Sequence, residues 1–542
     1  MNRQLALLLA AFAFACSMEA KTSDQSGPTD PQLGTGGTTP RSHQPEEEFS
    51  NAAPGGTSGA AGLSARKPAS SSTGGVSATS NATQRRPSSG GSFANSDSHQ
   101  VGTATGGASA RTNSTMQSLG SSGGRSTTNT RVAPSGASGT AESSGGARST
   151  SAVETGDALS GLEAYLAEPR ASRQAIEAQA FSQLPLTREQ ANRAAELLWK
   201  DYAQFITDTR RAEHNAKTIK LGELSLRYAF TTFGKKPASG RSLYISLHGG
   251  GNADASVNDQ QWENQKTLYQ PDEGIYLAPR APTNTWNLWH EKHIDPMFER
   301  LITNLIVLEE VNPDRVYVMG YSAGGDGVYQ LGPRMADYWA AAAVMAGHPN
   351  DASPLSLRNI GFTIHVGALD TAYDRNLLAP EWGKRLDQLQ AEDPSGYAHL
   401  VQVHQGKPHW MDLEDAVAVP WMAQFTRNPQ PNTVVWYQDD VPHTRFYWLA
   451  VDPEQASAKA EVRATCEGQR ITLETQGLTK VKIRLSDSLL DLDRPITVMA
   501  NGQEQSSSSV KRTIATLSKT LQERGDPRSI YCAELEVQVP QG

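Results

Sequence analysis

A serine framed by glycines is the residue of this sequence best suited to chemistry. The pentapeptide Gly320-Tyr321-Ser322-Ala323-Gly324 follows an apolar run at residues 316–319 and precedes a helical pattern. Such a pattern holds the serine on a tight strand-to-helix turn, where glycines remove side chains that would clash. The start of the helix favours negative charge beside the hydroxyl. Ser322 is therefore predicted to be a nucleophile, the alternative being a structural serine in a glycine-rich turn.

A second glycine-rich segment, His248-Gly249-Gly250-Gly251, follows the apolar run 243–247. Acyl transfer places negative charge on a carbonyl oxygen, and preset backbone N–H groups stabilise that charge. Glycines allow the main chain to approach closely. One or two of these glycines, with Gly249 and Gly250 favoured, are expected to form an oxyanion hole together with the N–H of Ala323. The alternative is a flexible turn.

The acid and base are expected later in the chain, in the order Ser, Asp or Glu, His. Asp370 follows the apolar run 362–366 and is favoured over Asp374, which is better placed to cap the segment after it. His409 lies in a Gly/Pro loop beyond the run 399–403 and is the predicted base. Three other histidines are expected to belong to strands: His365, His399 and His404.

Tryptophans accompany these segments. Trp286 and Trp289 follow an apolar run, and Trp410 adjoins the predicted base. Loops at the carboxyl ends of strands bind ligands in open α/β sheets. The three rings are therefore predicted to line a substrate site, with buried packing as the alternative.

The elements that must position these residues alternate between strand and helix patterns. Short apolar runs separated by helical segments indicate a mainly parallel sheet covered on both faces, an α/β fold over residues 217–429. The expected strands are residues 243–247, 274–278, 315–320, 340–345, 362–366 and 399–403, with helices at 295–311 and 325–335. Residues 219–228 indicate an initial hairpin.

Different patterns flank this region. Residues 156–216 are predicted to be helical, and Thr187 with Gln190 forms a capping-box pattern. Residues 430–542 contain many short strand candidates and little helix, so a small all-β C-terminal domain is expected, either free or integral to the preceding sheet. Cys466 and Cys532 are expected to form a disulfide there, with two buried thiols as the alternative.

The N-terminus looks like a targeting segment. Residues 1–20 combine a short positive region with an apolar run, as in a signal peptide. Cleavage before Cys16 would resemble a bacterial lipoprotein signal with a lipid anchor on that cysteine, and ordinary secretory cleavage near Ala20 is the alternative. Residues 21–155, rich in Gly, Ser and Thr, are predicted to be a disordered tether. The protein is therefore expected to be a cell-envelope lipoprotein, or secreted or periplasmic.

Composition excludes several classes. The 542 residues include 49 Lys+Arg and 57 Asp+Glu, a formal charge of −8, with no basic run typical of nucleic-acid binding. No apolar stretch is long enough for a membrane-spanning helix. Metal-binding and dinucleotide-binding patterns are absent, so no metal or cofactor is expected.

Residues 217–427 resemble the α/β-hydrolase superfamily through the two glycine-rich motifs. They are similar to secreted bacterial polyhydroxybutyrate depolymerase and feruloyl esterase-type enzymes, and to the catalytic domain of prolyl-oligopeptidase-like peptidases. The resemblance implies a triad of Ser322, Asp370 and His409. The expected activity is hydrolysis of a small-molecule or polymer ester through an acyl-enzyme. A serine peptidase and an inactive surface-binding protein are the alternatives, and the absence of an N-terminal propeller disfavours the peptidase.

Overall fold

The computed structural model describes residues 157–540. The predicted signal sequence at 1–20, Cys16 and the tether at 21–155 lie outside the described residues. The helix that begins after Thr187 has both bonds of the predicted capping box, one between the Gln190 N–H and the Thr187 hydroxyl and one between the Thr187 N–H and the Gln190 side chain. Among the described residues, two α-helices precede the sheet, α2 (Ala158–Ala167) and α3 (Arg188–Asn215), with short 3-10 helices between them.

An eight-stranded sheet forms the centre of the following region, in the order β1-β2-β4-β3-β5-β6-β7-β8. The hairpin β1–β2 is antiparallel, as predicted, and β2 also runs antiparallel to β4. All other neighbours in this sheet are parallel. The strands are β1 (Thr218–Leu221), β2 (Leu224–Phe233), β3 (Arg241–Leu247), β4 (Gly274–Arg280), β5 (Val311–Tyr321), β6 (Ala341–Met345), β7 (Gly361–Gly367) and β8 (His399–His404).

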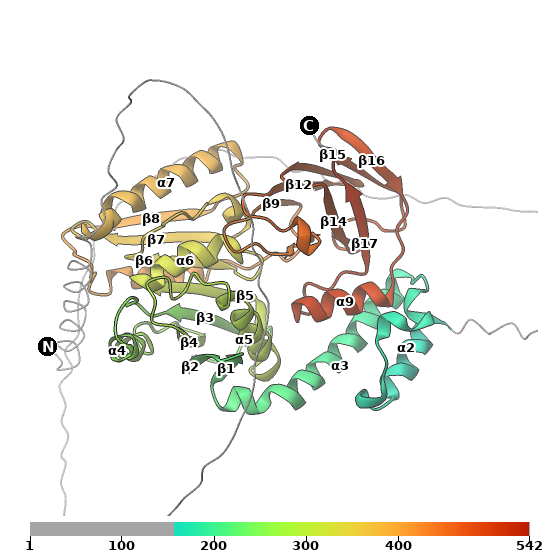
Figure 1. Cartoon of the computed structure of the whole chain (residues 1–542), viewed down its shortest axis with the longest axis horizontal. Helices are drawn as coiled ribbons and strands as arrows, with labels where there is room; N and C mark the ends of the chain where they lie inside the picture. The colour runs from blue at the N-terminus through green and yellow to red at the C-terminus, as the bar shows by residue number, and fades with distance from the viewer. Residues whose placement is uncertain (1–156, 541–542) are drawn as a thin grey trace, which may run out of the picture. The chain divides into compact units, whose positions relative to one another are not determined.

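Both faces are covered at the centre of this sheet, which explains why β3, β4, β6 and β7 are buried along nearly their whole length without alternation. On β3, Leu243 and Ile245 belong to one buried cluster, whereas Tyr244 belongs to another on the opposite face. Figure 1 shows α6 and α7 packed along the sheet. The helices of this region are α4 (Ala255–Gln265), α5 (Ile294–Leu308), α6 (Ala323–Arg334), α7 (Arg375–Glu392) and α8 (Ala418–Met422).

The C-terminal region is β-rich, as predicted, and forms two further sheets in the orders β10-β11-β14-β17 and β16-β15-β13-β12-β9. It also contains a helix that the sequence analysis did not predict, α9 (Ile514–Arg524), which packs beside α3 (Figure 1). The strands are β9 (Thr433–Tyr437), β10 (Arg445–Phe446), β11 (Leu449–Ala450), β12 (Glu461–Glu467), β13 (Arg470–Gln476), β14 (Lys480–Leu485), β15 (Ile496–Ala500), β16 (Gln503–Ser508) and β17 (Ala533–Gln538).

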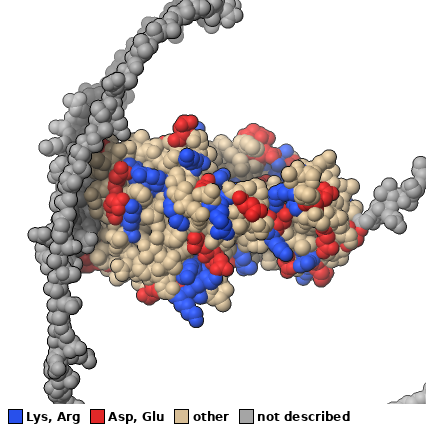
Figure 2. Space-filling view, turned by 90° about the horizontal axis from the view of Figure 1, so that it is seen from below, with Lys and Arg blue, Asp and Glu red and all other residues tan. Residues whose placement is uncertain are grey.

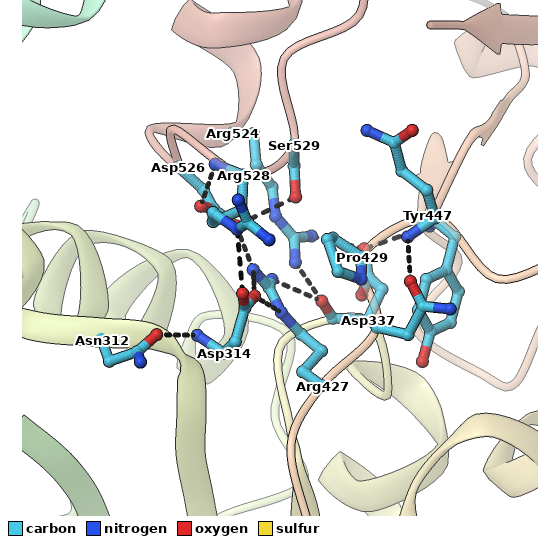
Figure 3. A network of polar contacts seen from close by, with 12 residues as sticks. Asn312, Asp314, Asp337, Arg427, Pro429, Tyr447, Arg524, Asp526, Arg528 and Ser529 are labelled. Atoms are coloured by element: carbon cyan, nitrogen blue, oxygen red, sulfur yellow. Dashed lines mark hydrogen bonds and ion pairs between the residues drawn. The ribbon is translucent and has the colours of Figure 1, made fainter. Parts of the chain in front are cut away.

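Buried ion pairs join this C-terminal region to the eight-stranded sheet. Figure 3 shows Arg427 between Asp314 of β5 and Asp526, with its Nη2 donating to both carboxylates at 2.8 and 2.7 Å. Arg528 donates to the second oxygen of Asp314 at 2.9 Å. Residues 157–540 also fall within one compact unit. The C-terminal region is therefore integral to the fold, because its removal would take from the buried Arg427 one of its two carboxylate partners.

The predicted disulfide between Cys466 and Cys532 is wrong. Both cysteines are free and buried, Cys466 on β12 and Cys532 just before β17, which belong to different sheets. Each thiol instead contacts a backbone carbonyl, that of Leu489 at 3.8 Å for Cys466 and that of Leu485 at 3.7 Å for Cys532. Burial raises the pKa of Cys466 to about 11 and the pKa of Cys532 to about 12, so both thiols stay protonated.

The surface seen in Figure 2 carries positive and negative side chains interspersed, without an extended patch of one sign. Within residues 157–540, no helix combines the length and apolar character needed to cross a bilayer.

Candidate active site

Three side chains from separate loops form a hydrogen-bonded chain. His409 Nε2 lies 3.0 Å from Ser322 Oγ, and His409 Nδ1 lies 2.7 Å from Asp370 Oδ2. An ionised carboxylate only accepts hydrogen bonds, so Nδ1 carries the proton and Nε2 is free to accept the serine hydroxyl. All three residues are buried. The arrangement can remove a proton from Ser322 and hold it on the imidazole.

The backbone at Ser322 explains how the hydroxyl reaches the histidine. Ser322 has φ 57° and ψ −125°, a strained conformation for a non-glycine residue. The turn is so tight that a Cβ on Gly320 would lie 2.2 Å from the carbonyl oxygen of Gly324. The Ser322 N–H donates to Met345 on the neighbouring strand at 2.9 Å. Because the surrounding structure holds this strained turn in place, the serine hydroxyl projects from the end of β5.

Parallel pairing brings the acid and the base together. Strands β7 and β8 end side by side, with Gly367 paired to His404. Beyond them, the Leu369 N–H donates to the Lys407 carbonyl at 2.9 Å, so the two loops are tied. Asp370 is the residue bonded to His409. Asp374 is exposed and precedes α7 without a side-chain capping bond.

The sequence analysis did not predict the contacts that one tyrosine and one arginine make with the triad residues. The Tyr321 hydroxyl donates to the His409 carbonyl at 2.7 Å and accepts from the Met411 N–H at 3.0 Å, which fixes the histidine loop. Burial holds the pKa of Tyr321 well above its ordinary value, so the hydroxyl remains a donor. Arg375 is buried, and its Nη1 lies 4.0 Å from Asp370 Oδ1, the carboxylate oxygen that does not accept from His409. Tyr321 lies inside the serine pentapeptide, which was the available signal.

The other histidines lie where the strand pattern placed them. His365 of β7 and His404 of β8 are buried and stacked, with a nitrogen–nitrogen distance of 3.2 Å. Burial lowers the pKa of His365 to about 3, so it stays neutral. His399 begins β8 and contacts Asp387 at 3.1 Å. None of the three is bonded to Ser322.

The predicted oxyanion loop lies against the nucleophile. A Cβ on Gly249 would fall 3.0 Å from the Ser322 Cβ and 3.6 Å from its Oγ. The N–H of Gly251 is already used, because it donates to the Asn258 side chain at 2.8 Å. Gly249 and Gly250 therefore remain the candidate donors from this loop, with Ala323 at the start of α6 as the third.

The three predicted substrate-site tryptophans have different positions. Trp286 is 60% exposed and is available to a ligand. Trp410 is 8% exposed and packs against Tyr321, with ring centroids 5.6 Å apart. Trp289 is fully buried, so its predicted role as a substrate wall is wrong. Its ring fills the core beneath the oxyanion loop, because an amphipathic indole can bury its face and satisfy its single N–H internally.

Strand order and site order together define the architecture. The mainly parallel sheet carries Ser322 after β5, Asp370 after β7 and His409 after β8. This is the chain order of the triad in α/β-hydrolase folds. Residues 218–422 have an α/β-hydrolase fold. Among residues 157–540, no three His, Cys, Asp or Glu side chains group as metal ligands would.

Comparisons with known proteins give structural neighbours that match part of this chain. No protein-family model and no curated protein matches the sequence. A thermostable esterase structure is 20% identical, with a TM-score of 0.32, over 39% of this chain and 62% of the esterase chain. The feruloyl esterase module from Clostridium thermocellum is 14% identical, with a TM-score of 0.28, over 38% of this chain and 86% of the module chain. A structure described as a putative dipeptidyl aminopeptidase IV from Bacteroides ovatus is 14% identical, with a TM-score of 0.29, over 38% of this chain and 35% of the aminopeptidase chain.

Proposed function

We propose that this protein is a serine hydrolase that cleaves carboxylic esters through an acyl-enzyme. The observation that carries the proposal is the continuous chain from Ser322 through His409 to Asp370, with bonds of 3.0 and 2.7 Å. A nucleophile, its base and the group that orients the base are the three parts that such catalysis needs.

In the first half of the reaction, Ser322 Oγ attacks the ester carbonyl while His409 Nε2 takes the hydroxyl proton. The carbonyl oxygen becomes negative and accepts hydrogen bonds from the backbone N–H groups of Gly249 or Gly250 and of Ala323. The C–O bond to the alcohol then breaks, and His409 returns the proton to the departing alcohol. Asp370 keeps the imidazole in the required tautomer throughout.

In the second half, water replaces serine as the nucleophile. His409 removes a proton from the water, the resulting oxyanion collapses, and the bond to Ser322 Oγ breaks. The proton returns to the serine, and a carboxylic acid leaves.

The test compares p-nitrophenyl esters of graded acyl length with peptide anilides on the full chain. We expect turnover of esters and none of anilides, and Ser322→Ala should abolish turnover and labelling by a fluorophosphonate probe. Ser353→Ala, a change in a loop serine outside the triad, should leave both ester turnover and probe labelling unchanged. Anilide hydrolysis exceeding ester hydrolysis would replace the ester proposal with the peptidase, and undiminished labelling of Ser322→Ala would contradict the nucleophile.

We also propose that the protein is exported, on the pattern of residues 1–20. Metabolic labelling with a radioactive fatty acid should mark the parent chain and spare Cys16→Ser. Export without labelling of the parent would support ordinary cleavage near Ala20, and retention of the whole chain in the cytoplasm would contradict the proposal.

A further inference from the structure

The buried Trp289 contacts the backbone that supplies the candidate oxyanion donors. Its indole Nε1–H donates to the His248 carbonyl at 2.9 Å, and its ring meets the His248 ring edge-to-face at 5.1 Å. On the other side, Trp289 faces α6, where a Cβ on Gly327 would lie 2.4 Å from the Trp289 Cβ. One side chain therefore packs between the oxyanion loop and the helix that begins at the nucleophile.

The next peptide of the same loop is held by the His248 side chain. His248 Nδ1–H donates to the Gly249 carbonyl at 2.7 Å, while Nε2 accepts from the Ala281 N–H at 3.1 Å. These two bonds require the neutral imidazole with its proton on Nδ1. Burial lowers the pKa of His248 to about 3, which agrees with that form.

Two successive carbonyls are therefore fixed, and each determines the direction of an N–H group. In a planar trans peptide, the C=O and the following N–H point in opposite directions. The bond from Trp289 to the His248 carbonyl thus sets the direction of the Gly249 N–H. The bond from His248 to the Gly249 carbonyl sets that of the Gly250 N–H. Glycine peptides have little intrinsic preference of direction, so an external constraint has a large effect on them.

We infer that Trp289 and His248 are positioning residues for the oxyanion hole. The Trp289 N–H holds the His248 carbonyl and so aims the Gly249 N–H at the substrate carbonyl oxygen, and the His248 side chain holds the Gly249 carbonyl and so aims the Gly250 N–H. This inference rests on the proposed ester hydrolysis and deepens it. Preset donors stabilise the transition state only if they are already aimed when charge develops. Losing the constraint should therefore slow the chemical step and leave ground-state binding of the ester unchanged.

The chain offers a matched control for the test. Trp262 also donates its indole N–H to a backbone carbonyl, that of Ala278, at 2.9 Å, but this carbonyl is not in the oxyanion loop. Trp289→Phe and Trp262→Phe each remove one such N–H and keep an aromatic ring. The measurements are kcat and KM for a p-nitrophenyl ester, affinity for an alkylboronic acid that mimics the tetrahedral intermediate, and melting temperature.

We expect Trp289→Phe to lower kcat about tenfold with KM unchanged, less than the roughly 10²–10³-fold cost of deleting an oxyanion donor outright. Its boronic acid affinity should fall by the same factor, whereas Trp262→Phe should stay within about twofold of the parent in both. If Trp289→Phe does not fold, His248→Asn takes its place, with the same expected loss. Equal kcat and boronic acid affinity in the test and control variants would overturn the inference and leave the proposed function intact. An inactive parent enzyme would instead contradict the proposed function.

Discussion

Replacing Asp370 with asparagine is the most direct test of how the histidine is oriented. The carboxylate oxygen Oδ2 now accepts the His409 Nδ1–H at 2.7 Å. The amide of Asp370→Asn can present its NH₂ group to the same nitrogen, which then has to be the unprotonated one. The proton moves to Nε2, so His409 can no longer accept the hydroxyl proton of Ser322.

The expected size of the effect follows from that change of tautomer. A triad Asp-to-Asn substitution lowers kcat by about 10⁴ while the geometry is preserved. This corresponds to about 5.5 kcal/mol of lost transition-state stabilisation. The fold should tolerate the change, because the backbone bonds of Asp370, from its N–H to Gly367 and from the Asn376 N–H to its carbonyl, are 3.0 and 3.1 Å long and do not involve the side chain.

Steady-state kinetics on one p-nitrophenyl ester, with Asp374→Asn as the matched control, decide the question. Asp374 is exposed and adopts a left-handed backbone conformation that asparagine also tolerates. Its substitution should leave kcat within about twofold of the parent. An inactive Asp374→Asn beside a nearly unchanged Asp370→Asn would refute the assignment of the acid.

Three further substitutions or treatments test other parts of the structure. Asp526→Ala should lower the free energy of unfolding in urea by about 3–5 kcal/mol, because it leaves the buried Arg427 with an incomplete set of partners; a change below about 1 kcal/mol would contradict the buried pairing. Burial, aided by Asp440 and Asp295, outweighs Arg334 and raises the pKa of Asp439 to about 6. Folding therefore favours its protonated form, and stability is lost as pH rises from about 4 to 6. Asp439→Asn should accordingly raise the melting temperature at pH 7.5 but not at pH 4, and an equal effect at both would show that the carboxyl does not titrate in this range. Cys466 and Cys532 should react with Ellman's reagent only after unfolding, whereas a melting temperature lowered by reductant would indicate a disulfide.

Much of the fold could be predicted from patterns visible in the sequence. Strands β5 and β7 are buried along the segments that lead to the site, because both faces of the sheet are covered there, and such runs stand out against the helices between them. β8 at the edge of the sheet is more exposed. Parallel strands end at a common edge, so residues just beyond β5, β7 and β8 had to lie near one another. Chain order then selected Ser322, Asp370 and His409. The structure shows their contact, while their catalytic role stays a prediction.

The features that the sequence analysis missed depend on tertiary packing. Trp286 and Trp289 lie in one loop, and the direction in which the chain turns decides which ring is buried. The sequence therefore could not indicate which of the two is exposed. The prediction of a disulfide was wrong because an oxidising compartment and a strand pattern do not indicate to which sheet each cysteine belongs. Helix α9 had a signal that was overlooked: Thr513 caps its start and Gly525 ends it in a left-handed conformation. Its residues Ile514, Leu517 and Leu521 are buried with helical spacing.

The buried ion pair between Arg427 and Asp526 sets an order on folding during synthesis. Asp314 and Arg427 pair within the hydrolase region, but Asp526, the second carboxylate bound to Arg427, is made 99 residues after that arginine. Until then the guanidinium lacks one of its two carboxylates, so this end of the hydrolase region cannot be buried without cost. Domains otherwise tend to fold from the N-terminal side as they are made. Here the hydrolase sheet reaches its final stability only when nearly the whole chain is available, so a chain interrupted before residue 526 would be a target for proteolysis.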